Sequence, residues 1–345
     1  MRYQNVFVEA LSYELPPVVV TSSELEMQLK AMYKALHIPL GQLETLTGIG
    51  ERRWWEKGYL LSDGATSAAQ KALENSPFKG KDIEALVYTG VCRENFEPAT
   101  ACRVAAKLGL KEDAFVYDIS NACLGVLNGI IDIANRIELG QIEVGMVVSS
   151  ETAREINETM IARMLKETNI EAFKYSLATL TGGSGSVAVL LTNQQRSSGR
   201  RRLLGGTAKA APQHYQLCKW GMELVGDSYT PTMFTDSVAV LKNGVELAQK
   251  TWRKFLEEIN WQPHSVDKVI CHQIGSEHQN TVLKALSIER DKDFCTYPYL
   301  GNIGTVSLPI TAAIAEERDF IEPGDRVGFL GIGSGLNCIM LGWEW

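Results

Sequence analysis

Residues 115–131, Phe115-Val-Tyr-Asp-Ile-Ser-Asn-Ala-Cys-Leu-Gly-Val-Leu-Asn-Gly-Ile-Ile131, change their hydrophobic pattern part-way along. They begin as a β-branched and aromatic run, which is typical of a buried strand. Leu124, Leu127 and Ile131 then recur at spacings of three and four, which predicts a helix. This strand–turn–helix unit places Cys123 at the join between the two elements.

A cysteine at the start of a helix faces unpaired backbone N–H groups and the positive end of the helix dipole. Both features favour the thiolate, which is the nucleophilic form of the side chain. A free cysteine is also common as a small, inert, buried hydrophobe. The stretch by itself leaves these two interpretations of Cys123 open.

The rest of the chain alternates strand and helix patterns in two similar halves. Residues 84–90 resemble residues 267–273 in pattern, and a Gly-Ser-Gly sequence precedes an apolar run at both 183–185 and 333–335. This organisation predicts an α/β fold with parallel sheets and two copies of one unit. The polar, basic segment 193–202 places the expected boundary between halves 1–195 and 196–345.

Composition bounds the class of protein. The 345 residues are 45% hydrophobic and 22% charged with a net charge of −7, so no general attraction to nucleic acid or anionic membranes is expected. The seven cysteines form no C-x-x-C pair, and we expect neither a disulfide framework nor a metal site. Because no signal peptide and no apolar run of about 18 residues is visible, we expect a soluble, cytoplasmic protein without a membrane span.

Two polar side chains of the second half complement Cys123. His272 follows an expected strand, and Asn302 lies in a glycine-bounded turn. In isolation His272 fits a core histidine, and Asn302 fits a turn residue in the left-handed conformation. Together they fit thioester chemistry, which needs a base for the thiol and donors for the oxygen that becomes negative.

Four motifs support this chemistry in order and spacing: Asn121-Ala-Cys123-Leu-Gly, His272-Gln, Gly301-Asn302-Ile-Gly and Gly331-Ile-Gly-Ser-Gly335. Through them the chain resembles the thiolase superfamily over essentially its whole length, and most closely the β-ketoacyl-ACP synthase III-like branch. The resemblance implies a five-layered αβαβα thiolase fold, built from two duplicated βαβαβαββ-type halves. It also implies a homodimer.

Within that branch the chain looks most like the acyl-CoA condensing enzymes of bacterial long-chain olefin biosynthesis. Residues 48–54 look like their arginine-containing loop, and residues 93–100 look like their glutamate–proline segment. The resemblance implies that Glu97 is a base reaching the partner subunit's active site, and that Arg52, Arg53 and Trp54 lie on the CoA side. A solvated surface is the other interpretation of these charged residues.

Glu97 separates two mechanisms. A non-decarboxylating Claisen condensation must remove an α-proton, and a carboxylate in an apolar site suits that task. The resemblance implies this alternative to decarboxylation, a reaction that joins two long-chain acyl-CoAs into a 2-alkyl-3-ketoacyl product. The resemblance assigns the acyl group to Cys123 and the thioester oxygens to His272 and Asn302.

We also expect an oxyanion hole at the backbone of Cys123, Ser334 and Gly335. No cofactor is expected, since acyl-CoA is the substrate, and enzymes that use the product are expected partners. The methionine-rich helices of residues 153–180, with Met160 and Met164, and the segment 206–236 are expected to line acyl channels.

Two other functions stay open at this point. A decarboxylating 3-oxoacyl-ACP synthase III-like enzyme would use malonyl-ACP or malonyl-CoA and would need no base at Glu97. An acyl-binding scaffold without catalysis is the alternative from another class, and the retained Cys123, His272 and Asn302 argue against it.

Overall fold

The computed structural model describes residues 1–199 and 201–345, so Arg200 of the basic segment 193–202 lies outside the described residues. Nine strands are hydrogen-bonded in the order β11-β12-β13-β8-β1-β7-β6-β4-β5. Their bounds are β11 Lys268–Cys271, β12 Arg326–Gly333, β13 Asn337–Glu344, β8 Arg201–Ala210, β1 Val6–Glu14, β7 Gly185–Asn193, β6 Val144–Glu151, β4 Ala85–Tyr88 and β5 Phe115–Asp118.

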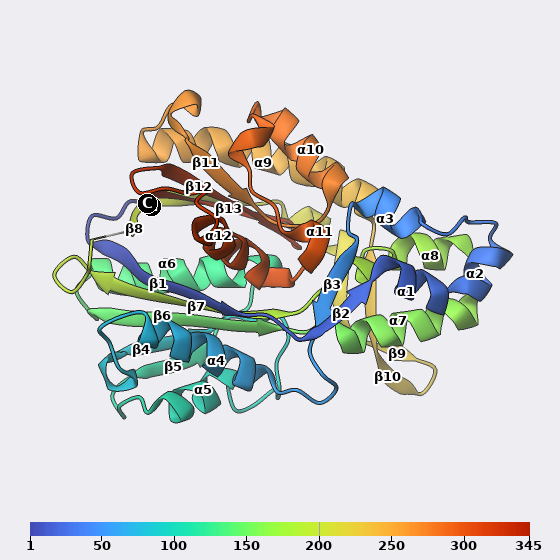
Figure 1. Cartoon of the computed structure of the whole chain (residues 1–345), viewed down its shortest axis with the longest axis horizontal. Coiled ribbons are helices and arrows are strands. Elements are labelled where there is room, and N and C mark those ends of the chain that lie inside the picture. The colour runs from blue at the N-terminus through green and yellow to red at the C-terminus, as the bar shows by residue number, and fades with distance from the viewer. Residues whose placement is uncertain (200) are drawn as a thin grey trace.

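Among the described residues, β1 and β8 share the pairs Phe7–Arg202 and Val8–Arg201, fewer than any other neighbouring strands of the sheet. On either side of this joint the strands lie in two separate layers (Figure 1). Helices α6 (Gly125–Glu138) and α12 (Ser307–Glu317) lie between the two layers. One core cluster joins these helices to strands of both layers, among them Val189 of β7 and Phe329 of β12.

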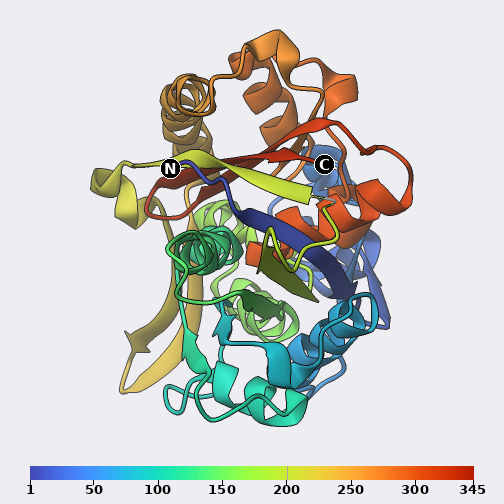
Figure 2. The ribbon, with the colours of Figure 1, turned by 90° about the vertical axis from the view of Figure 1, so that its left-hand side faces the viewer.

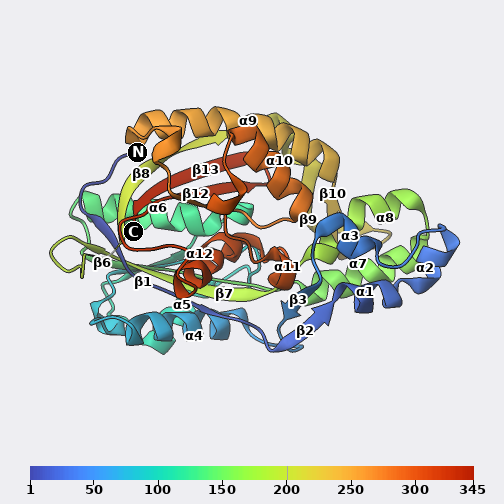
Figure 3. The same ribbon diagram turned by 45° about the horizontal axis from the view of Figure 1, so that its top comes forward.

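The outer faces of the two layers are covered by helices. α4 (Leu61–Glu74) and α5 (Thr100–Leu108) cover the layer that contains β4, β6 and β7 (Figure 1). α9 (Ser237–Ile259) and α10 (Ser276–Leu286) cover the layer that contains β8, β12 and β13 (Figure 3). The expected five layers, αβαβα, are therefore confirmed. The division into halves at residue 195 stays a prediction.

The expectation of parallel sheets is only partly right. β4 pairs in parallel with both β5 and β6, and β11 pairs in parallel with β12. The pairs β6–β7, β7–β1, β12–β13 and β13–β8 are antiparallel. Between β12 and β13 only residues 334–336 intervene, and a parallel crossover needs about a dozen residues or more.

A side lobe flanks the ends of the two layers. It contains β2 Val18–Thr21, α1 Ser22–Gln28, α2 Lys30–Ala35, α3 Gln42–Thr47, β3 Glu51–Trp54, α7 Arg154–Glu167, α8 Ile170–Ser176, β9 Cys218–Val225, β10 Ser228–Thr235 and α11 Tyr297–Leu300. The helical segment 153–180 divides at Asn169, whose side chain caps α8 by accepting a hydrogen bond from the Ala172 N–H.

Two segments of this lobe differ from expectation. Residues 51–54, expected in a loop, pair with β2 as strand β3. The segment 206–236, expected to lack a regular pattern, completes β8 and then forms the hairpin β9–β10, gold in Figure 2. Gly226 and Asp227 make its two-residue turn, and Gly226 has a φ of +63°, a conformation that glycine adopts readily.

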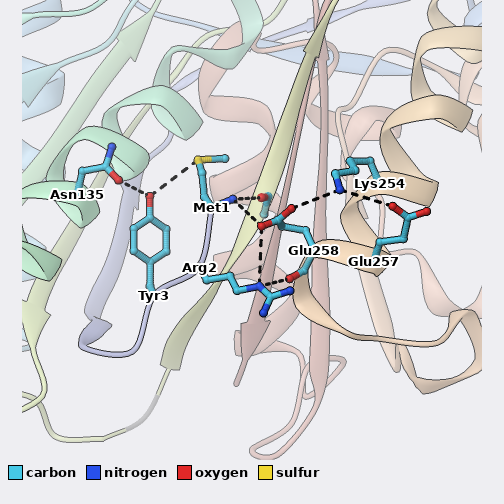
Figure 4. Close-up of polar contacts among 8 residues, drawn as sticks. Met1, Arg2, Tyr3, Asn135, Lys254, Glu257 and Glu258 are labelled. Atoms are coloured by element: carbon cyan, nitrogen blue, oxygen red, sulfur yellow. Dashed lines mark hydrogen bonds and ion pairs between the residues drawn. The ribbon is translucent and has the colours of Figure 1, made fainter.

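The first residues of the chain connect the middle and outer helices (Figure 4). The Tyr3 hydroxyl donates to Asn135 of α6 at 2.8 Å, and the Arg2 Nε donates to the Glu258 carbonyl oxygen of α9 at 2.6 Å. The Met1 nitrogen lies 3.4 Å from the Glu258 carboxylate. These contacts fix the two helices relative to the joint between β1 and β8.

Within residues 1–199 and 201–345, no helix combines the length and apolar character that crossing a bilayer requires.

Close packing at the start of α6 generates a stability prediction. A Cβ added to Gly125 would lie 2.2 Å from the Thr89 carbonyl oxygen. We expect Gly125→Ala to lower the free energy of unfolding by about 1–3 kcal/mol, since the backbone must move to admit the methyl group. Urea unfolding followed by circular dichroism measures the change.

Gly221→Ala, on β9, is the matched control because no atom lies within 4 Å of its added Cβ. Equal stability of the two variants would contradict the close approach of α6 to β4.

Candidate active site

Cys123 lies in the short turn Ala122–Leu124 between β5 and α6. Ala122 has a φ of +45°, a left-handed conformation that is strained for a residue with a side chain. Gly333 packs against this turn, because a Cβ added there would lie 3.4 Å from the Cys123 nitrogen. The turn that follows β12 therefore lies directly beside the cysteine.

A cavity of about 800 Å³ begins at this cysteine. Its wall includes Cys123 from the first half of the chain and His272, Asn302 and Ser334 from the second. The structure thus brings together residues that are up to 211 positions apart in the sequence, as 334 − 123 shows. Such a volume is in the upper part of the range for ligand pockets, about 300–1,000 Å³.

The expected resting thiolate is not what the site favours. Burial, followed by smaller contributions from the nearby Cys218 and Glu151, raises the pKa of the Cys123 thiol to about 12. Hydrogen bonds from the backbone N–H groups of Cys123 and Ser334 act in the opposite direction. Desolvation outweighs the helix dipole here, so Cys123 rests as a neutral thiol.

His272 is neutral for the same reason. Burial lowers its pKa to about 3, with a smaller contribution from the charge of His278. The backbone around it is held firmly, since the His272 N–H donates to the Leu330 carbonyl oxygen at 3.1 Å and the Cys271 N–H donates to Asp293 at 3.1 Å. A neutral imidazole can accept the thiol proton during attack, which removes the need for a thiolate at rest.

Asn302 presents its amide donors to the cavity. Its side-chain oxygen accepts the Gly304 N–H at 3.1 Å, and its backbone bonds to Thr181 and Gly183. The left-handed conformations of this turn belong to Gly301 and Gly304, with φ of +69° and +61°. The interpretation of Asn302 as a left-handed turn residue is therefore wrong.

The expected oxyanion residues lie in the turn after β12. The Ser334 N–H faces the Cys123 sulfur, as its effect on the thiol pKa requires. The Asn337 amide fixes the turn by donating to Asn121 at 3.1 Å and to the Ser334 carbonyl oxygen at 3.4 Å. The role of Gly335, which has a φ of +139°, stays a prediction.

Glu97 does not line the cavity of its own chain. It lies exposed in the loop between β4 and α5, next to Phe96, whose side chain is 101% exposed. A base at Glu97 can therefore act on a cysteine only if it reaches another subunit.

The residues expected on the CoA side lie deeper than predicted. Arg52 is 0% exposed, and its guanidinium donates to the Val20 carbonyl oxygen at 3.4 Å and the Ser22 hydroxyl at 3.0 Å. Trp54 is also buried and donates to the Gly182 carbonyl oxygen at 3.1 Å. The Arg52 guanidinium and the Trp54 ring are thus not presented at the surface as expected, and their contacts with CoA stay predictions. Arg53 is half-buried, and its contact with CoA stays a prediction.

The cavity walls also differ in part from expectation. Met160 and Met164 are buried in α7 and do not line the cavity. The helical segment contributes Ile156, Leu177 and Ala178 instead. The hairpin β9–β10, in the segment expected to line an acyl channel, contributes Trp220 and Met233 among other residues.

Comparison with known proteins agrees with this geometry. Residues 46–181 match the model of the thiolase N-terminal domain, and residues 256–345 match that of the 3-oxoacyl-[acyl-carrier-protein] synthase III C-terminal domain. The chain is 57% identical to the acyl-CoA:acyl-CoA alkyltransferase of Shewanella oneidensis, with 100% of both chains covered. It is 33% identical to that of Xanthomonas campestris, again over 100% of both. The chain belongs to the acyl-CoA:acyl-CoA alkyltransferase family, within the thiolase superfamily.

Solved structures of this family share the fold. A cysteine-to-alanine variant of Xanthomonas campestris OleA superposes with a TM-score of 0.94 at 33% identity, covering 100% of this chain and 98% of that one. A cysteine-to-serine variant, crystallised with lauric acid and lauroyl-CoA, gives a TM-score of 0.92 at 33% identity and covers 99% and 100%.

Sequence reasoning missed one buried acid of this alkyltransferase-family site. Glu151, at the end of β6, lines the cavity and is 3% exposed. Burial raises its pKa, while hydrogen bonds from the backbone N–H groups of Val91, Cys92 and Thr305 lower it. A carboxylate directly after an apolar strand was the signal in the sequence that could have identified it.

The neutral state of the thiol generates a pH prediction. With a pKa raised to about 12, the thiolate fraction of Cys123 grows as the pH rises toward that value and is small at neutral pH. We expect alkylation of Cys123 by iodoacetamide to accelerate by about tenfold per pH unit between about pH 7 and about pH 10. Peptide mapping by mass spectrometry measures it, with the exposed Cys102 as internal reference. A rate plateau below about pH 8 would indicate a thiolate–imidazolium pair instead.

Proposed function

We propose that this protein catalyses the non-decarboxylating Claisen condensation of two long-chain acyl-CoAs into a 2-alkyl-3-ketoacyl product. The observation that carries the proposal is the joint position of Cys123, His272 and Asn302 on one cavity of about 800 Å³. The full-length identity of 57% to an acyl-CoA:acyl-CoA alkyltransferase supports the same chemistry.

The first half-reaction transfers an acyl group to Cys123. The sulfur attacks the thioester carbonyl carbon of the first acyl-CoA while the neutral His272 takes the thiol proton. The backbone N–H groups of Cys123 and Ser334 stabilise the oxygen that becomes negative. Collapse of the tetrahedral intermediate expels the CoA sulfur, which takes the proton from the imidazolium, and leaves acyl-Cys123.

The second half-reaction forms the carbon–carbon bond. Glu97 of the partner subunit removes an α-proton from the second acyl-CoA. The side-chain NH₂ of Asn302 and the ring N–H of His272 stabilise the enolate oxygen that forms. The α-carbon attacks the acyl-Cys123 carbonyl, and the Cys123 sulfur leaves and recovers a proton from Glu97. The 2-alkyl-3-ketoacyl-CoA is then hydrolysed to the acid by water.

This mechanism requires a homodimer. Glu97 is exposed in one subunit and absent from that subunit's cavity wall, whereas its task needs an apolar site. The exposed Phe96 beside it supplies an apolar group for an interface. A second copy of the chain would bury both residues and complete each cavity.

The setting of the reaction follows from its chemistry. The seven cysteines are all free, which fits the reducing cytoplasm where we place the protein. Side chains, backbone N–H groups and the thioester supply all the chemistry proposed, without a cofactor. The product is a 3-keto acid with an acidic α-position, so we expect a partner enzyme that uses this acid as its substrate.

We expect Glu97→Ala to lower the condensation of tetradecanoyl-CoA with itself by about 10²–10⁴-fold, the range for loss of a general base. Acylation of Cys123 should persist, because the first half-reaction does not use Glu97. Product analysis by gas chromatography and intact-mass measurement of the acyl-enzyme separate the two steps.

Glu112→Ala, which removes another exposed loop carboxylate, is the control and should keep wild-type condensation. Full condensation by Glu97→Ala would overturn the proposed base. Release of labelled CO₂ from malonyl-CoA, without product from two long-chain acyl-CoAs, would favour the decarboxylating synthase to which the relatives near 24% identity belong by name.

A further inference from the structure

The mechanism above gives no task to the buried Glu151. Its carboxylate lies at the end of β6, where Oε1 accepts the Val91 N–H at 2.9 Å and Oε2 accepts the Cys92 N–H at 3.1 Å. Two consecutive N–H groups at the start of the loop that follows β4 thus converge on one carboxylate.

Val91 and Cys92 form the root of the loop that carries Glu97. The Tyr88 hydroxyl lies 2.8 Å from the carbonyl oxygens of both Cys92 and Ser150, which ties the same root to β6. At the far end of the loop, the N–H groups of Thr100 and Ala101 donate to Asp118 at 3.0 Å each. Both ends are therefore fixed by buried or half-buried acceptors.

Between these anchors the loop projects outward. Residues 95–98 are exposed, in contrast to the buried Cys92 and Thr100 on either side. Within the loop, Glu94 is also held, since its carboxylate accepts the Ser62 N–H at 2.7 Å. The carboxylate of Glu151 is therefore one of the anchors that set where Glu97 lies, and the one that fixes the start of the loop.

Glu151 also packs under the turn that carries Asn302. A Cβ added to Gly304 would lie 3.2 Å from the Glu151 Cγ, so this turn rests directly on the acid. Burial of a carboxylate without a cation is costly, and a side chain that filled the space without charge would avoid that cost. The retention of the charge fits a task that needs an acceptor for several N–H groups at once.

We propose that Glu151 is a positioning residue, which holds the Val91–Cys92 root so that Glu97 reaches the cavity of the partner subunit. This inference rests on the proposed function, in which Glu97 acts across the dimer. Glu151 is not assigned as the base itself, because each of its two oxygens already accepts a backbone N–H, one from Val91 and one from Cys92. Its effect on the reaction is therefore exerted in the other subunit.

The variant Glu151→Gln tests the first part of the inference. Glutamine has the same shape but replaces one acceptor oxygen with an NH₂ group, which faces a backbone N–H and releases the root. We expect condensation of tetradecanoyl-CoA to fall by at least about tenfold, while Cys123 still acquires an acyl mass. Glu143→Gln removes an exposed carboxylate next to the start of the same strand and should leave both steps unchanged.

Mixed dimers test whether the effect crosses to the partner. Differently tagged chains are co-expressed, and the heterodimers are purified by both tags. In a dimer of an E151Q chain with a C123A chain, the remaining cysteine belongs to the E151Q chain. The loop that reaches it comes from the C123A chain, whose Glu151 is intact, so condensation should proceed at about half the wild-type rate. A wild-type chain paired with an E151Q/C123A chain also retains one cysteine, but the loop that reaches it is the released one, so condensation should fall to about half the rate of the E151Q homodimer.

The reverse pattern would overturn the inference, because it would mean that Glu151 acts on its own chain's cysteine. Equal loss in both pairings, or loss of acylation in E151Q, would assign Glu151 to folding and would overturn it too. The same two pairings made with E97A instead of E151Q test the proposed function separately. If E97A fails to show the cross-subunit pattern, the proposed base is wrong, and this outcome is independent of Glu151.

Discussion

The placement of two ionisable groups below the surface is the constraint on which the rest of the site depends: His272 is buried and Cys123 is half-buried. Burial keeps the cysteine protonated, with its pKa raised to about 12, and keeps His272 neutral, with its pKa lowered to about 3. The two groups can exchange a proton during attack without any resting charge in an apolar cavity. The cavity can therefore accept alkyl chains and still support ionic chemistry for the duration of each step.

The five-layered fold makes this site possible because it brings loops of the two halves together. Cys123 comes from the layer built by β4, β5 and β6, and His272 and Asn302 come from segments around β11 and α12. In the proposed reaction the single chain does not complete the site, because Glu97 lies exposed at its surface. In the proposed dimer, each subunit would supply Glu97 to the cavity of the other, and Glu151 would fix the position of Glu97.

Much of this could be predicted from the sequence because four short motifs carry it. The order of the Cys123, His272 and Asn302 motifs was enough to predict both the fold and their meeting in one cavity.

The burial of individual side chains could not be predicted in the same way. Arg52 looked like a surface cation, but it lies under β2 with its donors bonded to Val20 and Ser22. The resting thiolate failed similarly, because the local helix end is visible in the sequence while the surrounding desolvation is not. The hairpin β9–β10 was missed because its turn, Gly226-Asp227, lay among scattered aromatic residues.

The central position of α12 has a consequence for how the chain is made. This helix is buried along nearly its whole length between the two sheet layers, yet it is formed by residues 307–317. Until those residues leave the ribosome, the inner faces of β1 and β7 are covered by α6 alone, so the part that α12 covers in the folded protein stays exposed to water. Synthesis at about 5–20 residues per second leaves that surface open for many seconds. A nascent chain of this kind is a natural substrate for chaperones that bind apolar strands, and its folding is coupled to completion of translation.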